Sequence, residues 1–513
     1  TMSRVRSAVM GVLSSQFFFF FNIFLALWTT PLYLDILGKE GYGLYTVIIQ
    51  LIAYVYIMDL GLSAGITREL AGFKDIEKEE NRIAINHVVS TSFFVYVLIG
   101  ILSFAVVLLA MPYVPMVFDI PTEFNGVLND ILISYGVFML INFPLKAIAG
   151  IFYAHQRQVL SNTLGFISNL ISIVLPLILL ITWKEIGLWA FVIANGLNIF
   201  ISVAINVYFI LKHYPFLKIR FQFFKSRVFK EMFRFGMYTF LIQLAVQVVF
   251  QTDRILVGSL VSLSAVSIYA ITLRLPELCL QTVFRVTNSS FPALVERFKN
   301  NATQDMALIH NKLMLLQMTI IVCAVILIGV LDKPFIELWI GANFFSGWGV
   351  LGIYIVLMVL LTMSNVSAVC LNSSGDIKSL SVWAILEAIL NLGLSLYLGR
   401  KYGIIGIIAA TLFASAITTS WFIPYKTMKT FNIPTWDYLK PVLIPIAYFT
   451  PFAGVCYIGA KYYFEYVGGN WLSIIIFGLI IGMVLMFFAW FVVLRKEFLL
   501  YIPEKIRRKY KFI

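Results

Sequence analysis

The chain contains few charged residues for its length. Asp, Glu, Lys and Arg make up 12% of the 513 residues, whereas 61% of the residues are hydrophobic. A soluble domain is about one-quarter charged and about half apolar, so this composition excludes a soluble enzyme or binding domain. Long polar stretches that could hold a soluble domain are also absent: the longest expected connections are 67–87, 212–234, 424–440 and the tail from Arg495. The sequence therefore predicts an integral membrane protein.

Sequence signals for disulfides, metal binding and nucleotide hydrolysis are absent. The four cysteines lie in apolar segments without CxxC spacing (Cys279, Cys323, Cys370 and Cys456). The four histidines are expected in cytoplasmic turns, without a ligand partner at a useful spacing (His87, His155, His213 and His310). No GxxxxGK[S/T] motif is present, so a P-loop is not expected. We expect no metal, no cofactor and no enzymatic activity.

Apolar segments long enough to cross a bilayer fill most of the chain. A crossing takes about 20 apolar residues. Fourteen such helices fit the sequence, at roughly 11–37, 43–66, 88–111, 128–151, 160–181, 187–211, 235–256, 264–290, 313–331, 347–371, 380–399, 403–423, 441–460 and 471–494. The first is too long for the apolar region of a cleavable signal peptide, so we expect it to be a membrane helix.

The distribution of lysine and arginine predicts the orientation. With the N-terminus in the cytoplasm, 28 of the 38 Lys and Arg residues fall on the cytoplasmic side and six outside. This bias predicts that both termini are cytoplasmic. The net charge of +13 therefore does not indicate nucleic-acid binding. The densest basic block, 212–234, interleaves cations with aromatic residues, as does a helix lying on anionic lipids. Ordinary positive-inside loops explain that block, and the basic tail 505–511, equally well.

A weak internal repeat predicts two lobes. Gly187 opens the sixth expected helix and Gly403 the twelfth, and Tyr45 and Tyr269 hold matching places near the starts of the second and eighth helices. Two related halves around a site in the membrane are typical of secondary transporters. The expected domains are an N-terminal lobe (1–211), a basic amphipathic cytoplasmic linker (212–234), a C-terminal lobe (235–423), and two further helices with a basic cytoplasmic tail (424–513).

Four cations lie inside apolar segments: Lys146, Arg254, Arg274 and Arg285. A charge at the bilayer centre costs at least ~3 kcal/mol on insertion scales, so such residues usually face a protein-lined, wet cavity. Several cations in one membrane protein indicate an anionic cargo on a central path. Three acids also lie within the expected helices, namely Asp253, Glu277 and Glu387.

Polar residues form a stripe on each of two neighbouring expected helices. The seventh carries Gln243, Gln247, Gln251 and Arg254, and the eighth carries Arg274, Glu277, Gln281, Arg285 and Asn288. Spacings of three and four place the members of each stripe on one helical face. We expect the three arginines to form a ladder across the membrane that binds phosphate or pyrophosphate, because guanidinium groups bind these anions through two hydrogen bonds. Buried pairs with Glu277 and Asp253 are the alternative.

Further candidates lie in other expected helices. Asn142 and Lys146 share a face of the fourth helix, and Asp59 and Arg68 lie toward the cytoplasmic end of the second. Glu387 and Asn391 share a face of the eleventh. Asp253, Glu277 and Glu387 are candidates for binding a coupling proton or sodium ion. Pairing of each acid with a nearby cation or amide is an equally good interpretation.

Several short motifs occur in the chain. They are Pro31-Leu32-Tyr33, the run from Leu37 to Tyr45 (LGKEGYGLY), Asp59-Leu60-Gly61-Leu62 with Thr67-Arg68, and Tyr402-Gly403-Ile404-Ile405-Gly406. In these motifs the chain resembles the bacterial polysaccharide flippases. These transporters belong to the multidrug/oligosaccharidyl-lipid/polysaccharide superfamily and share the MATE-type fold. The resemblance implies a V-shaped all-α protein with two six-helix lobes, a cationic central cavity, and helices 13 and 14 like those of the lipid-moving branches.

The function implied by this resemblance is translocation of an undecaprenyl-pyrophosphate-linked oligosaccharide from the inner to the outer leaflet of the bacterial inner membrane. The cargo would be an O-antigen, capsule or exopolysaccharide repeat unit, moved by alternating access and driven by H⁺, Na⁺ or the membrane potential. A monomer that contacts anionic lipids and the polysaccharide polymerase machinery is expected. The alternatives are a MATE-type cation or drug antiporter, for which an acidic lumen is expected, and a membrane enzyme of polysaccharide assembly. Such an enzyme needs a large outward loop, and the largest one expected here, 112–129, is short.

Overall fold

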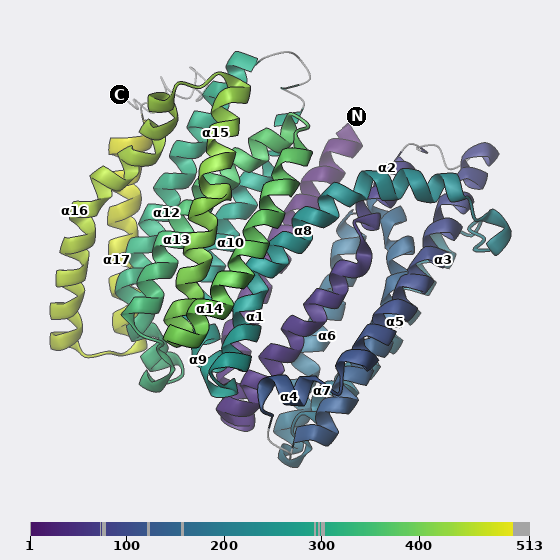
Figure 1. The fold of residues 1–513 in the computed structure, drawn as a ribbon, viewed down its shortest axis with the longest axis horizontal. Coiled ribbons are helices and arrows are strands. Elements are labelled where there is room, and N and C mark those ends of the chain that lie inside the picture. Colours follow the sequence, from purple (N-terminus) through teal and green to yellow (C-terminus); the bar gives the residue numbers. More distant parts are fainter. Residues whose placement is uncertain are drawn as a thin grey trace. The chain divides into compact units, whose positions relative to one another are not determined.

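The computed structural model describes residues 2–71, 73, 78–120, 124–154, 158–291, 294–295, 298 and 303–495 (Figure 1). Every regular element in these ranges is a helix, so the predicted all-α fold is confirmed. The chain divides into two compact units, Thr1–Ser267 and Ile268–Ile513. The predicted lobe boundaries at 211 and 235 stay a prediction, and the basic tail 505–511 lies outside the described residues.

Unit 1 is built from long helices joined by short turns. Its helices are α1 (Met2–Tyr56), α2 (Leu62–Ala71), α3 (Glu79–Ala110), α4 (Val114–Phe118), α5 (Asn125–Ala154), α6 (Gln158–Thr182), α7 (Trp189–His213) and α8 (Ser226–Leu260), with short 3₁₀ turns at Ile57–Asp59, Lys184–Ile186 and Phe221–Phe223. α3 packs along α5, and α6 contacts both α1 and α7. α8 packs against α1 and α2 and therefore belongs to this unit.

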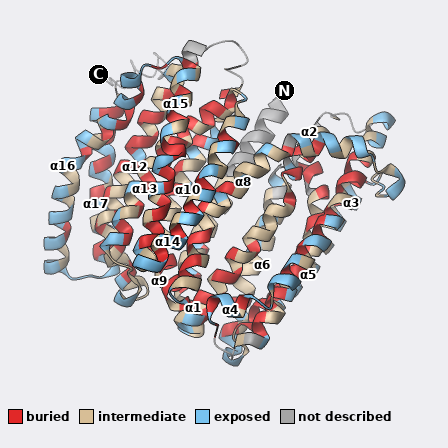
Figure 2. Ribbon diagram, viewed as in Figure 1, coloured by how far each residue is buried: buried red, intermediate tan, exposed pale blue. Residues whose placement is uncertain are grey.

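Unit 2 begins within α9 (Leu263–Thr272). It continues through α10 (Arg274–Ser289), α12 (Thr303–Trp339), α13 (Trp348–Ser373), α14 (Ile377–Ile417), α15 (Thr419–Phe431), α16 (Thr435–Val467) and α17 (Trp471–Phe488), with a 3₁₀ turn at Ala342–Phe344 and a π-helical turn at Ala489–Leu494. α12 contacts α10, α13, α16 and α17 and forms the centre of the unit. Buried residues run along α12 and α13, whereas α16 is mostly exposed, which fits a helix that faces lipid (Figure 2).

Eleven helices in the described ranges are long and apolar enough to cross a membrane, or twelve if the bent pair α9–α10 is one span. α9 and α10 meet at an angle of 51°. Two of the eleven contain a break: α1 is interrupted at Gly38 and α14 at Gly403, both with positive φ, which glycine adopts without steric cost. Gly38 lies between the expected helices 11–37 and 43–66, and Gly403 is the first residue of the expected helix 403–423. The count of fourteen stays a prediction.

Three local expectations are corrected. The span expected over 313–331 extends to Trp339, because apolar residues resume after Pro334 and Ile336 is buried. Asp332 therefore lies inside α12 and is fully buried. His87 and His310 lie within α3 and α12 rather than in turns, and His213 is the last residue of α7. His155 is outside the described residues.

The basic block 212–234 does not form one amphipathic helix. α7 ends at His213, and α8 begins only at Ser226. Between them the backbone is held by polar side chains of α3. Asn86 Oδ1 accepts from the main-chain N–H of Lys218 (2.9 Å), and Thr91 Oγ1 accepts from that of Lys225 (2.9 Å). These bonds replace the hydrogen bonds that a helix would supply to the same backbone groups.

Candidate functional site

A cavity of about 630 Å³ lies inside unit 1, between α1, α5, α6 and α7. Its volume is within the range of ligand-binding pockets, roughly 300–1,000 Å³. The polar residues that line it are Tyr45, Tyr56, Tyr135, Asn142, Lys146, Ser168, Asn169, Ser172, Asn195, Ser202 and Asn206. The predicted cavity residues Asn142 and Lys146 thus share one cavity wall, because a spacing of four residues places them on the same face of α5.

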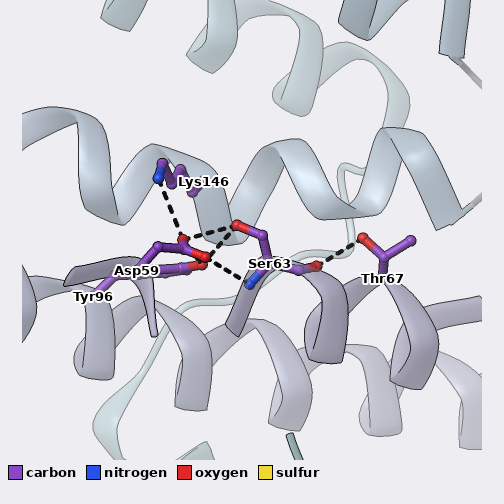
Figure 3. A network of polar contacts seen from close by, with 5 residues as sticks. All are labelled: Asp59, Ser63, Thr67, Tyr96 and Lys146. Carbon is purple, nitrogen blue, oxygen red and sulfur yellow. Dashed lines mark hydrogen bonds and ion pairs between the residues drawn. The ribbon is translucent and has the colours of Figure 1, made fainter. Parts of the chain in front are cut away.

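Lys146 is held at the cavity by an ion pair (Figure 3). Its Nζ lies 3.3 Å from Oδ1 of Asp59. The hydroxyl of Tyr96 donates to the same oxygen at 2.7 Å, and the hydroxyl of Ser63 donates to it at 2.8 Å. Asp59 is buried, so its charge is balanced by a cation and by hydrogen bonds from three neighbouring elements.

The local backbone explains the position of Asp59. The 3₁₀ turn Ile57–Asp59 ends at Leu60, which adopts a left-handed conformation (φ 53°), and Gly61 follows with φ 69°. The chain thereby turns into α2, where Ser63 donates its main-chain N–H to Asp59 Oδ2 (3.3 Å). The segment Asp59-Leu60-Gly61-Leu62, noted above for its resemblance to the flippases, is thus the turn that presents a carboxylate to α5.

Aromatic rings flank the same lysine. Lys146 Nζ lies 4.7 Å from the ring centroid of Phe143 and 5.3 Å from that of Tyr56. A cation over a ring face is attracted by the ring quadrupole, which adds about 0.5–2 kcal/mol depending on exposure. The charge of Lys146 is therefore neutralised by Asp59, and the orientation of its side chain is fixed by the neighbouring rings. The side chain remains 28% exposed.

The polar residues of α6 and α7 form a hydrogen-bonded ladder. Asn198, fully buried, accepts from the hydroxyl of Ser168 (3.0 Å) and donates to that of Ser172 (2.8 Å). Ser202 donates to Asn198 Oδ1 at 3.2 Å, and Asn206 donates to the carbonyl of Ser202 at 2.8 Å. The sequence analysis did not identify these residues. Their spacing on α7 was the available signal, because Asn195, Asn198, Ser202 and Asn206 lie three, four and four apart on one face.

The stripe predicted for the seventh helix lies on α8 in unit 1. Gln243 is exposed, and Gln247, Gln251 and Arg254 are half-buried. Arg254 Nη1 donates to Gln251 Oε1 at 3.5 Å, and the neighbouring Asp253 is buried. Arg68, another predicted contact, lies in the last turn of α2. The four residues of this stripe thus lie on one helix, as predicted. Their binding of a cargo stays a prediction.

The second stripe lies entirely on α10 in unit 2. Arg274 is the first residue of α10, directly after the bend, and Glu277, Gln281, Arg285 and Asn288 follow along one face. Four residues on another face are buried: Pro276, Leu280, Val283 and Thr287. Gln281 and Asn288 are exposed, and the Nε atom of Arg274 is buried without a hydrogen-bond partner in the described part of the chain. The ladder that would join Arg254 to Arg274 and Arg285 involves both units and stays a prediction.

Glu387 and Asn391 lie on the buried face of α14. The carboxylate of Glu387 accepts hydrogen bonds from the hydroxyls of Ser415 and Thr419, the second at 2.6 Å. Asn391 donates to Thr411 at 2.9 Å, and its own Oδ1 is buried without a hydrogen-bond partner within the described ranges. The expected helical face is thus observed, and the partners of Glu387 are hydroxyl groups.

Comparison with known proteins places the chain in a family. Residues 9–298, more than half of the chain, match the family described as polysaccharide biosynthesis protein. The chain belongs to this family. Among its relatives is EpsK of Bacillus subtilis (strain 168), an uncharacterized membrane protein, at 23% identity over 332 residues. The match spans 64% of each chain. A protein of Shigella flexneri named for O-antigen transport is 24% identical over 393 residues, which cover 72% of this chain and 86% of that protein.

Solved structures share the fold. The lipid II flippase MurJ in an inward closed conformation matches with a TM-score of 0.67 at 16% identity, over 93% of this chain and 98% of that chain. An inward-facing multidrug resistance MATE family transporter of the MOP superfamily matches with a TM-score of 0.63 at 13% identity. The match covers 80% of this chain and 96% of that chain. At these identities the likeness concerns the fold alone, and it confirms the MATE-type architecture implied by the sequence resemblance.

Proposed function

We propose that the protein is a flippase that moves an undecaprenyl-pyrophosphate-linked saccharide from the inner to the outer leaflet of a bacterial inner membrane by alternating access. The observation that carries the proposal is the cavity among α1, α5, α6 and α7, which combines one fixed cation with amides, hydroxyls and tyrosines. Lipid would not solvate such a lining, so it suits a polar cargo within the membrane. Membership of the polysaccharide biosynthesis family and a relative named for O-antigen transport support the same conclusion.

The arginines of α8 and α10 are proposed to bind the pyrophosphate. Arg274, Arg285 and Arg254 lie on polar stripes of otherwise apolar helices. A guanidinium binds phosphate oxygens through two parallel hydrogen bonds and stays charged in proteins. Lys146 and Arg68, both in unit 1, are further candidates for contacts with the headgroup. The lipid tail would remain in the bilayer while the headgroup crosses.

The energy source is proposed to be ionic. The inside-negative membrane potential favours outward movement of an anion by about 2.3 kcal/mol per charge per 100 mV. Resetting the unloaded carrier moves its cations through the same field, so a bound proton or sodium ion is the expected coupling partner. Glu277 is the first candidate because it shares the α10 face with Arg274 and Arg285; Asp253 and Glu387 are the others. Glu277→Gln should abolish the response of transport to an imposed pH gradient while cargo binding is retained.

A MATE-type antiporter is the second candidate, favoured by the shared fold. Its usual clients are cations, which an acidic lumen would attract. None of the described residues that line the unit 1 cavity is acidic, and the charge of Lys146 there is paired with Asp59. The α10 stripe carries two arginines and one glutamate. The net positive charge of this stripe favours an anionic cargo.

Deletion of the gene tests the proposal. The deletion strain should accumulate a lipid-linked saccharide in the inner leaflet, identified by mass spectrometry, and the wild-type gene should reverse the accumulation. Arg285→Ala should reach the membrane without restoring transport. Arg285→Lys should restore it in part, because a lysine supplies the charge without the bidentate geometry. The proposal fails if no lipid-linked saccharide accumulates, and full complementation by Arg285→Ala would remove this arginine from the mechanism.

A further inference from the structure

We infer that the cavity of unit 1 is a saccharide subsite, in which neutral side chains of α5, α6 and α7 recognise the hydroxyl groups of the sugar next to the pyrophosphate. The inference rests on the proposed function and assigns a specific part of the cargo to a specific cavity. All the residues that line this cavity belong to unit 1.

The chemistry of the lining points to a hydroxylated ligand. Apart from Lys146, the polar side chains that line the cavity are amides, hydroxyls and tyrosines. Amide and hydroxyl groups both donate and accept hydrogen bonds, as do the hydroxyl groups of a sugar. A pyrophosphate offers acceptors only and would leave the carbonyl oxygens of these amides without donors. The one cation is already paired with Asp59 at 3.3 Å, which reduces the attraction of the cavity for an anion.

The lining is arranged before any ligand binds. Asn198, fully buried behind the cavity wall, links Ser168 and Ser172 of α6 at 3.0 and 2.8 Å, and Ser202 donates to its Oδ1 at 3.2 Å. These bonds fix the positions of hydroxyls on two adjacent helices. Recognition by groups that are already ordered costs less conformational entropy than recognition by mobile side chains.

A buried donor marks the α5 wall. The Nδ2 atom of Asn142 is inaccessible to solvent and has no hydrogen-bond partner in the ranges that the structure describes. Buried amide donors in proteins are normally paired, so an unpaired one beside a cavity indicates a ligand acceptor. Asn142 lies one turn from Lys146 on the same face of α5, and both line the cavity.

Aromatic rings complete the lining. Tyr45 and Tyr56 of α1 and Tyr135 of α5 contribute to the wall. Tyr45 is stacked on Phe191 with ring centroids 4.3 Å apart, which holds its orientation. Tyrosine offers an apolar ring face together with a polar hydroxyl. A sugar ring has the same two properties, because its C–H groups form apolar patches between its hydroxyls.

Binding of defined lipids to the purified full chain in lipid nanodiscs tests the inference. The probes are undecaprenyl pyrophosphate alone and undecaprenyl pyrophosphate carrying glucose, galactose or an N-acetylhexosamine. The wild-type protein should bind at least one sugar-bearing lipid about tenfold or more tightly than undecaprenyl pyrophosphate, the equivalent of one or two well-made hydrogen bonds. Asn142→Leu and Asn206→Leu should each reduce that preference by about tenfold and leave the affinity for undecaprenyl pyrophosphate unchanged.

Asn162→Leu is the matched control. It makes the same chemical change on α6, where Asn162 donates to Ser14 (3.1 Å) and does not line the cavity. It should retain the wild-type preference. Two results would overturn the subsite. One is a wild-type protein without any preference for the sugar-bearing lipids, a result that does not depend on the folding of the variants. The other is an undiminished preference for these lipids in both cavity variants. If neither undecaprenyl pyrophosphate nor its glycosylated forms bind more tightly than phosphatidylglycerol, the proposed function itself fails.

Discussion

Lys146 and Asp59 form an ion pair across 87 residues of sequence, with Nζ and Oδ1 3.3 Å apart. The pair joins α5 to the turn between α1 and α2, and Tyr96 of α3 donates to the same carboxylate oxygen. Ser63 of α2 donates to it as well, so four segments of unit 1 meet at one carboxyl group (Figure 3). Lys146 also lines the cavity proposed to take the saccharide. The stability of unit 1 and the geometry of the cavity are linked through this group.

Asp59→Ala should destabilise the protein by about 1–3 kcal/mol, because it leaves the buried donors without their charged acceptor. Lys146→Met should cost less, because Tyr96 and Ser63 still bind the carboxylate and the lysine side chain is 28% exposed. The double variant Asp59→Ala with Lys146→Met should be more stable than the sum of these two single changes predicts. Thermal unfolding in detergent measures all of these. Strict additivity would show that the pair contributes no coupling energy.

Gly236→Ala should destabilise unit 1. A Cβ atom at Gly236 of α8 would lie 2.5 Å from the carbonyl oxygen of Gly61, so α8 would have to move away from the turn that carries Asp59. Gly196→Ala, in the interior of α7, is the control. Beyond the backbone of α7 itself, no described atom lies within 4 Å of the added carbon, so this change should be neutral or slightly stabilising. Thermal unfolding midpoints of the two variants test this prediction, and the midpoint of Gly236→Ala should be the lower one. Equal midpoints would mean that α8 does not pack closely on Gly61.

Asp332→Leu should raise the thermal stability. Asp332 is fully buried in α12, and neither carboxylate oxygen has a hydrogen-bond partner among the described residues. Burial of a polar group without a partner costs about 1–3 kcal/mol on mutational scales, and leucine is of similar length. Asp332→Asn, which keeps a polar group in place, should give a smaller gain. A lower unfolding midpoint for the leucine variant would show that the carboxyl group makes a stabilising interaction.

Asp376 should make stability depend on pH in the acidic range. Burial raises the pKa of this carboxyl, but hydrogen bonds from Ser379 and Lys426 outweigh it and lower the pKa overall. Lys426 Nζ lies 3.2 Å from Asp376 Oδ2. A lowered pKa in the folded protein stabilises it above the unfolded value of about 3.9, and the contribution disappears as the pH falls through the lower folded value.

Unfolding midpoints of the wild-type protein and Asp376→Ala at pH 7 and at pH 3 measure this effect. The variant should be less stable at pH 7 by about 1 kcal/mol, because helix α14 loses its N-cap and the half-exposed ion pair adds little. The difference should shrink at pH 3. A difference of the same size at both pH values would contradict the assignment.

The all-α fold and most of the membrane helices can be predicted from helical periodicity and from the length of the apolar segments. Gly38 directly follows one expected helix and Gly403 begins another, and glycine is the residue that accepts the positive φ of each break. The sequence predicts too short a span for α12, because Asp332, Lys333 and Pro334 interrupt the apolar run. Tertiary packing around Ile336 and an ion pair between Lys333 and Glu337 (3.7 Å) instead continue the helix.

The candidate site is predictable only where its members share a helix. The α8 and α10 stripes follow from spacings of three and four, and so does the proximity of Asn142 to Lys146. The pairing of Lys146 with Asp59 depends on the packing of α5 against the turn before α2, which no local pattern specifies. The ladder between α6 and α7 carries no charge and is therefore inconspicuous, although its α7 members, like those of the α8 stripe, are three or four residues apart.

Transport by the purified protein tests the central claim most directly. The full chain is reconstituted into liposomes with an undecaprenyl-pyrophosphate-linked saccharide initially in one leaflet, and an impermeant sugar-modifying enzyme reports the fraction of saccharide that reaches the other leaflet. The account predicts protein-dependent translocation that is lost with Arg285→Ala and retained with the control Asn162→Leu. Translocation no faster than in protein-free liposomes, by a wild-type protein that is folded and correctly inserted, would contradict it.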